Sequence, residues 1–157
     1  YADLARRRLN ANILNEAYVS GLFKNQFDLL INTKVLEHVP DPLPFLKVMY
    51  ADLKKGGLLF IEVPDVSDIY SLPSTHDRFW IPHIYFFSVN TLGALLRKVG
   101  FHIVAHRVIK TTRKRSYLQF VAEKTEIVSD EIAVKPYDNI EELKNCVLLN
   151  LGNHNDQ

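Results

Sequence analysis

FDLLINTKVLEHVPDPLPFLKVMYADLKKGGLLFIEVPD, residues 27–65, decides the fold because it reads as a strand, a helix and a second strand in succession. Residues 27–31 form a short apolar run, the pattern of a strand that is buried on both faces. Asp41 and Pro42 predict the start of a helix with an apolar stripe, and the glycine pair 56–57 predicts its end. Residues 58–63 are a second apolar run, so the stretch predicts a βαβ unit with two neighbouring parallel strands.

Weaker patterns lie on either side of this unit. Residues 3–9 predict a short helix, and the apolar pair at 13–14 predicts a brief strand. Beyond an irregular stretch, residues 88–100 predict a helix that Ser88 caps and Gly100 ends. Residues 101–109 and 117–122 alternate between apolar and polar side chains, as the strands of an antiparallel hairpin do. The expected fold class is therefore α/β, with parallel strands and a hairpin that closes the sheet.

Composition excludes several classes of protein. With 47% hydrophobic and 24% charged side chains in 157 residues, the chain has the profile of one soluble globular domain. The formal net charge of +1 favours neither nucleic acid nor an anionic membrane as a partner. Cys146 is the only cysteine, which excludes an internal disulfide and favours a reducing cytoplasm. No apolar run approaches the roughly 20 residues that span a bilayer.

A binding site is expected at the carboxyl edge of the sheet, because ligands of open α/β sheets lie beyond the carboxyl ends of the strands. The residues that directly follow the predicted strands are then the candidates for its lining. Those candidates are Asn15, Glu16 and Ala17 after the first strand, Asn32, Thr33 and Lys34 after the second, and Pro64 and Asp65 after the third.

Two blocks of the sequence resemble class I S-adenosylmethionine-dependent methyltransferases of the small-molecule type. The first is the quoted stretch, similar to the family's segment from its fourth strand to its fifth, and the second is HIYFFSVNTLGALLRKVGFHIV, residues 83–104. The resemblance covers roughly residues 1–124 and implies a Rossmann-like methyltransferase domain there. Residues 125–157 are then a carboxyl-terminal extension, with a helical pattern at Ile140, Leu143, Val147, Leu148 and Leu151.

The resemblance implies S-adenosylmethionine as cofactor and methyl transfer to a small molecule as activity. In similar enzymes the residues at Glu16 and Ala17 border the adenine, and those at Asn32, Thr33 and Lys34 border the methionine end. The family's glycine-rich turn and its ribose-binding acid are absent, because Gly21 is the first glycine and lies in a predicted connection. The resemblance therefore implies that this sequence lacks about a third of the usual domain. We therefore expect the chain alone to bind the cofactor weakly or not at all, to be inactive, and to associate through an uncovered sheet edge.

Histidines supply the candidate catalytic groups. His83 lies in the segment that resembles the family's substrate-facing loop, and an imidazole there suits removal of a proton from the acceptor. His38 is a second catalytic candidate, while Tyr85 and His76 are candidates for binding the acceptor. The alternatives for these side chains are local hydrogen bonding and loop packing, and the alternative for the whole chain is a noncatalytic methyltransferase-like module that binds a partner.

No metal site is expected. In some relatives an acid three residues before the glutamate of this segment joins the glutamate and the histidine in holding a divalent ion. Here that position is Lys34, whose cation opposes a metal beside Glu37 and His38.

Overall fold

The structure is a computed structural model that describes residues 2–19, 21–71, 82–112 and 115–125. Except for the strand expected at residues 13–14, its elements follow the predicted order up to residue 125, with two additional 3₁₀ turns. They are α1 (Ala2–Leu9), β1 (Phe27–Thr33), η1 (Leu36–His38), α2 (Pro42–Asp52), β2 (Leu53–Pro64), η2 (Val66–Ser71), α3 (Val89–Val99), β3 (Phe101–Lys110) and β4 (Ser116–Lys124).

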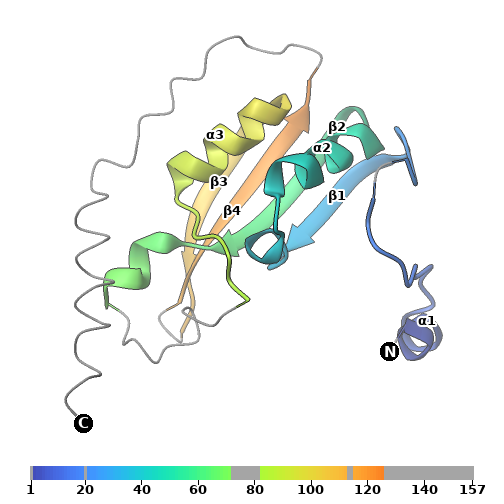
Figure 1. Ribbon diagram of the computed structural model, residues 1–157, viewed down its shortest axis with the longest axis horizontal. Helices are drawn as coiled ribbons and strands as arrows, with labels where there is room; N and C mark the ends of the chain where they lie inside the picture. The colour runs from blue at the N-terminus through green and yellow to red at the C-terminus, as the bar shows by residue number, and fades with distance from the viewer. Residues whose placement is uncertain (1, 20, 72–81, 113–114, 126–157) are drawn as a thin grey trace.

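The four strands form one sheet in the order β1-β2-β4-β3. β1 and β2 are parallel neighbours, in a register that pairs Leu30 with Leu59 and Asn32 with Ile61, which confirms the predicted βαβ unit. β4 lies antiparallel between β2 and β3, so the predicted hairpin closes the sheet (Figure 1). The α/β fold class is confirmed.

α2 begins as predicted and ends earlier. The Asp41 side chain caps it by accepting a hydrogen bond from Leu43 N at 3.3 Å. The helix ends at Asp52, and the chain enters β2 directly at Leu53, so the glycine pair lies within the strand rather than at a helix terminus. Gly57 is needed there because a Cβ would lie 2.9 Å from the Lys54 carbonyl oxygen.

α3 has both of the predicted termini. Ser88 and Thr91 form a capping box, in which each side chain bonds the other residue's backbone N–H. Gly100 ends the helix in the left-handed region with φ +112°, and a Cβ there would lie 3.3 Å from the Tyr50 ring of α2. The same glycine therefore stops α3 and lets Tyr50 approach its backbone.

The hydrophobic core lies between the sheet and the two longer helices, α2 and α3, which both cover the face turned to the viewer in Figure 1. Alternate residues of β2 and β4 point into it, and several are fully buried. The strands contribute the buried residues Leu59, Ile61, Val63, Leu118, Phe120 and Ala122, and the helices contribute Leu46, Met49, Leu92 and Leu96.

The opposite face of the sheet carries apolar side chains without a helix over them in the described part of the chain. On β1, Leu29 is 50% exposed and Ile31 is 65% exposed. Phe60 of β2 and Val121 of β4 are half-buried on the same face. We call this the open face of the sheet.

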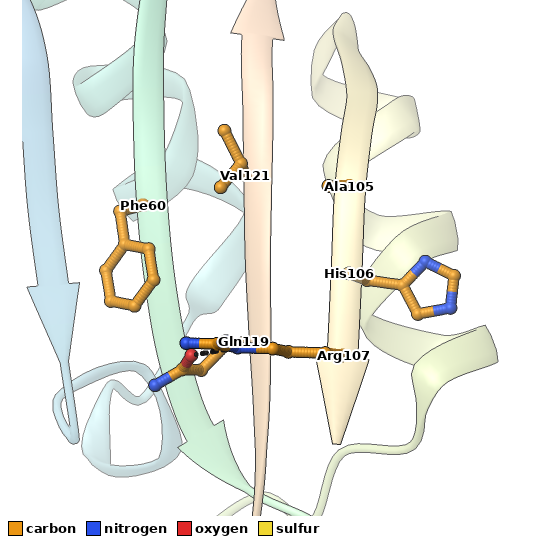
Figure 2. A pocket seen from close by; sticks show the side chains of 6 residues that line it. All are labelled: Phe60, Ala105, His106, Arg107, Gln119 and Val121. Atoms are coloured by element: carbon orange, nitrogen blue, oxygen red, sulfur yellow. Dashed lines mark hydrogen bonds between the residues drawn. The ribbon is translucent and has the colours of Figure 1, made fainter. Parts of the chain in front are cut away.

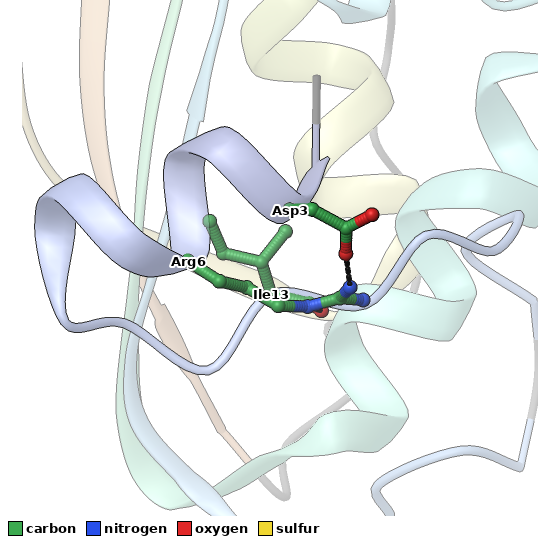
Figure 3. A network of polar contacts seen from close by, with 3 residues as sticks. All are labelled: Asp3, Arg6 and Ile13. Carbon is green, nitrogen blue, oxygen red and sulfur yellow. Dashed lines mark hydrogen bonds and ion pairs between the residues drawn. The ribbon is translucent and has the colours of Figure 1, made fainter.

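The amino-terminal segment departs from the prediction. α1 buries none of its residues and stands apart from the sheet in Figure 1. Arg6 pairs with Asp3 Oδ1 within the helix at 2.6 Å, and its Nε ties the helix to the following segment by donating to the Ile13 carbonyl oxygen at 2.7 Å (Figure 3). The predicted strand at 13–14 is wrong, because this segment has no regular structure. A pair of apolar residues forms a strand only where a neighbouring strand pairs with it, and no described strand does.

Two features predicted from the sequence, His76 and the carboxyl-terminal helix with its apolar residues at 140–151, lie outside the described residues. Within the described ranges, no helix has both the length and the apolar character that a membrane crossing requires.

Candidate active site at the carboxyl edge of the sheet

The parallel arrangement brings the ends of β1 and β2 to the same edge of the sheet. Lys34, just after β1, donates its backbone N–H to the Glu62 carbonyl oxygen of β2 at 2.8 Å. Asn32 and Thr33 precede it as the last residues of β1. The predicted lining from β1 therefore does lie at the carboxyl edge, beside the end of β2.

Asn32 is the buried member of this group, with 6% of its surface exposed. Its amide oxygen Oδ1 is buried and has no hydrogen-bond partner among the described residues. A buried acceptor without a donor is costly, by about 1–3 kcal/mol. Asn32 is thus suited to accept a hydrogen bond from a group that the described residues do not provide.

Lys34 adopts a backbone conformation that is unusual for a side chain with a Cβ. Its φ is +56°, in the left-handed region, which costs of order 1 kcal/mol or more for a residue other than glycine. Its ammonium group lies 3.9 Å from Glu62 Oε1 and 4.7 Å from the centre of the Tyr117 ring. The Lys34 cation is therefore directed towards β2 and β4.

A row of polar side chains crosses the open face near this edge. Gln119 Nε2 donates to Glu62 Oε2 at 2.5 Å, and Arg107 Nε donates to Gln119 Oε1 at 2.9 Å. Beside the row is a shallow hollow of about 260 Å³ (Figure 2). Its lining residues are Phe60, Ala105, His106, Arg107, Gln119 and Val121. Sequence reasoning missed this row, because only the strand register shows which alternating residues become neighbours.

The loop before α3 docks on the loop that contains η1. The Glu37 carbonyl oxygen accepts hydrogen bonds from the backbone N–H groups of Ile84 at 2.9 Å and Tyr85 at 3.2 Å. The Tyr85 hydroxyl donates to the Pro40 carbonyl oxygen at 3.0 Å. Three bonds to backbone acceptors therefore join two segments that lie far apart in the sequence.

This docking brings the two candidate histidines together. The ring centres of His38 and His83 are 4.9 Å apart, with an angle of 46° between the ring planes. His38 Nδ1 lies 2.7 Å from the Pro82 carbonyl oxygen, which can only accept, so Nδ1 carries the hydrogen. In neutral His38 the lone pair is consequently on Nε2, which lies 3.8 Å from Glu37 Oε1. The side chain of Glu37 is almost fully buried.

Asp65, after β2, has a structural role. Its backbone N–H donates to the Ser116 carbonyl oxygen at 3.1 Å, and its side chain accepts from Ser67 N at 3.1 Å. It also forms an isolated parallel bridge to Phe87. Asp65 is buried and holds the start of η2 against the loop before α3.

Glu16 and Ala17, predicted to line the cofactor, are exposed in a segment without regular structure. Their neighbour Tyr18 is the anchored residue: its hydroxyl donates to Asp52 Oδ2 at 2.7 Å, and its ring meets the edge of Phe45 with 5.7 Å between centres. Burial, followed by the hydrogen bond and the charge of Asp52, raises the pKa of the Tyr18 phenol above its ordinary value. This contact fastens the amino-terminal segment to α2.

Comparison with known proteins is consistent with this geometry. Residues 5–106 match the sequence model of a family described as "Methyltransferase domain". The curated ubiquinone biosynthesis O-methyltransferase of Parvibaculum lavamentivorans is 51% identical over 35 residues, which are 22% of this chain and 14% of that protein. The chain thus spans a small part of the length of this relative.

Solved structures share the fold. A SAM-dependent methyltransferase from Thermotoga maritima, described as a possible histamine N-methyltransferase, superposes with a TM-score of 0.64 at 23% identity, covering 79% of this chain and 69% of that one. The 1,6-didemethyltoxoflavin-N1-methyltransferase of Burkholderia thailandensis gives 0.63 at 23% identity over 80% of this chain and 56% of that one. The latter structure holds 1,6-didemethyltoxoflavin and S-adenosylhomocysteine.

Proposed function

Because this chain belongs to the methyltransferase domain family, we propose that it forms part of an enzyme that transfers a methyl group from S-adenosylmethionine to a small molecule. The observation that carries the proposal is that the end of β1 and the docked loop before α3 both lie at the carboxyl edge of the sheet. Asn32 supplies a buried acceptor at that end, and His38 and His83 meet where the loop docks.

The residues present fit one side of the proposed cofactor. Asn32 Oδ1 is a buried acceptor without a partner among the described residues, and Thr33 beside it is exposed. We propose that these two side chains, with the Lys34 backbone, meet the methionine end and that Glu16 and Ala17 border the adenine. When bound, S-adenosylmethionine supplies a methyl group on a positively charged sulfur, which makes its carbon an electrophile.

The chain's own residues serve the acceptor. We assign proton removal to the His83 imidazole, since it is half-buried beside His38 in the loop that precedes α3. His38 is the second catalytic group, with its tautomer set by the Pro82 carbonyl oxygen. Tyr85, whose ring is exposed, is proposed to contact the acceptor together with His76, which lies outside the described residues.

We further propose that these 157 residues alone do not turn over. The chain covers 56% and 69% of the two methyltransferase structures above, and its first glycine, Gly21, has open space around it rather than a neighbouring backbone. We propose that the side of the cofactor that a glycine-rich turn would cover stays hydrated in this chain. The small-molecule acceptor, the balanced net charge and the single cysteine favour a cytoplasmic protein with no nucleic-acid or membrane partner.

The test is methyl transfer by the longest form that the gene encodes. That form is incubated with S-adenosylmethionine and a panel of hydroxyl and amine metabolites, and new methyl groups are detected by mass spectrometry. We expect His83→Ala to lower turnover by about 10²-fold with little change in cofactor affinity, because general base catalysis contributes at least that factor.

His102→Ala is the matched control, since His102 is exposed on β3 and outside the docked loops. Transfer that is equally fast in both variants would remove His83 from the chemistry. A longest form that neither binds S-adenosylmethionine nor methylates any acceptor would favour the noncatalytic binding module instead.

A further inference from the structure

We infer that Glu37, His38 and His83 form a binding site for one divalent transition-metal ion, for which Zn²⁺ is the best match. The inference does not rest on the proposed function. It departs from the expectation drawn from Lys34, and it uses a residue, His83, that lies 45 positions beyond His38 in the sequence.

The first argument is the spacing of the ligand atoms. One nitrogen from each imidazole and one carboxylate oxygen of Glu37 all lie within 4.8 Å of one another. Donors about 2.0–2.1 Å from a tetrahedral ion are about 3.4 Å apart. His38 Nε2 and Glu37 Oε1, at 3.8 Å, are too far apart for a hydrogen bond and close to that spacing. Even two ligand atoms 4.8 Å apart would reach the spacing of a tetrahedral site if each moved by about 0.7 Å towards the ion.

The second argument is the orientation of His38. A histidine that binds a metal through one nitrogen usually donates the other N–H to a carbonyl or a carboxylate, which fixes the ring and its tautomer. His38 Nδ1 makes that bond to the Pro82 carbonyl oxygen at 2.7 Å. The lone pair is therefore on Nε2, the nitrogen that lies 3.8 Å from Glu37 Oε1. Pro82 directly precedes His83, so one docked loop both orients His38 and delivers the third ligand.

The third argument concerns Lys34, the cation that argued against a metal. Its ammonium group lies over the Tyr117 ring and near Glu62, on β4 and β2. That charge is thereby engaged by partners outside the three-residue cluster. Because position 34 is a lysine and not an acid, the segment itself offers two ligands, Glu37 and His38. The third ligand is His83 from the docked loop.

The donor set selects the kind of ion. Two imidazole nitrogens and one carboxylate oxygen suit Zn²⁺ and other first-row transition ions, whereas Mg²⁺ and Ca²⁺ prefer oxygen ligands alone. Glu37 is buried, while His38 and His83 are each partly exposed, so the fourth position of a tetrahedral ion would face solvent. That position can hold water or an oxygen atom of the acceptor. With the ion bound, His83 holds the metal rather than a proton.

The test measures binding without cofactor or acceptor. The 157-residue chain is treated with a chelator and titrated with Zn²⁺ by calorimetry, and Mg²⁺ is titrated separately. We expect one strong Zn²⁺ site and none for Mg²⁺. His83→Ala and Glu37→Gln should each weaken Zn²⁺ binding at least about 100-fold, whereas the control His102→Ala should leave it unchanged.

A second measurement covers variants that lose stability. The Co²⁺-loaded chain should show the intense visible absorption of a four-coordinate ion, and His83→Gln, which keeps the size of the side chain, should abolish it. Zn²⁺ should also raise the melting temperature of the parent chain and not that of His83→Gln.

Several outcomes would overturn the inference: absence of a strong Zn²⁺ site, equal affinity for Mg²⁺, or unchanged Zn²⁺ binding in the double variant His38→Ala with His83→Ala. The last would place the ion on histidines elsewhere in the chain. If the 157-residue chain binds zinc at this site and the longest form that the gene encodes transfers no methyl group, the inference is supported and the proposed function is contradicted. The reverse result would do the opposite.

Discussion

The two faces of the sheet differ sharply in how far their apolar side chains are covered. On the face covered by α2 and α3, Ile61 and Leu118 are fully buried, and the packing is continuous with both helices. On the open face, Ile31 of β1 is 65% exposed and no described helix lies over it. Strands that read as continuous apolar runs are typical of sheets covered on both sides. Around β1 the open face therefore has the apolar side chains of a covered sheet but no described cover, whereas its polar row lies over β2, β4 and β3.

The largest expected effect separates two phenylalanines on opposite faces. Phe120 is 1% exposed in the core, so Phe120→Ala should lower the free energy of unfolding by about 3–5 kcal/mol. Phe60 is half-buried on the open face, and Phe60→Ala should cost about 1 kcal/mol or less. Urea denaturation of both variants measures the pair. Equal losses would mean that the open face is covered in solution, and the comparison would fail.

The next effect concerns the contact of Tyr18 with α2, the helix that covers the core face of the sheet. Tyr18→Phe removes the hydrogen bond to the Asp52 carboxylate and should cost about 1–2 kcal/mol near neutral pH. Because the folded-state pKa of Tyr18 is raised, this stabilisation is fully present below the ordinary tyrosine value near 10 and is lost as pH rises above it.

Denaturation of the parent chain and Tyr18→Phe between about pH 8 and 11 measures this loss. The difference in their unfolding free energies should shrink as pH increases, since the other tyrosines titrate in both proteins. A difference that stays constant or grows with pH would contradict the assigned contact.

Association through the open face is a smaller effect. Replacing both Leu29 and Ile31 by lysine places two charges on exposed apolar positions and should raise the dissociation constant for self-association by tenfold or more, about 1.4 kcal/mol. Analytical ultracentrifugation over a range of concentrations measures it. The control Asn90→Lys adds a charge to an exposed position of α3. If Asn90→Lys disperses the chain equally well, net charge is responsible and the open face is not.

The smallest effect concerns the polar row on the open face. Gln119→Ala breaks two hydrogen bonds, to Glu62 and Arg107, in a partly solvated position, and should cost about 1 kcal/mol or less. Chemical denaturation of Gln119→Ala and of Arg107→Ala, which loses only one of the two bonds, compares their losses of unfolding free energy. A loss similar to that of Phe120→Ala would show that this row lies in an interior.

Features that depend on neighbouring residues could be predicted from the sequence. The caps at Asp41 and Ser88 and the stop at Gly100 follow from local backbone chemistry, and each is present. The parallel pairing of β1 with β2 also follows, since two apolar runs joined by a helix have one common arrangement.

Features that depend on distant residues could not. The glycine pair 56–57 predicts the end of a helix. In the structure Gly57 lies in the sheet, where a Cβ would clash with neighbouring carbonyl oxygens. The pair at 13–14 read as a strand, although no described strand pairs with it. At the candidate site, His38 and His83 were each identified, but the hydrogen bond from His38 to Pro82 spans 44 positions and only the fold reveals it.

The strand order has a consequence for the time course of folding. β4 is the last described strand along the chain, and it lies between β2 and β3, which have no other link within the described sheet. During synthesis the edge of β2 stays unpaired until the ribosome has released residues up to Lys124, roughly 3–12 s after Pro64 at 5–20 residues per second. The second edge of β2 is therefore paired only when β4 has been synthesised. A nascent chain that stalls before Ser116 exposes this unpaired apolar edge to other polypeptides.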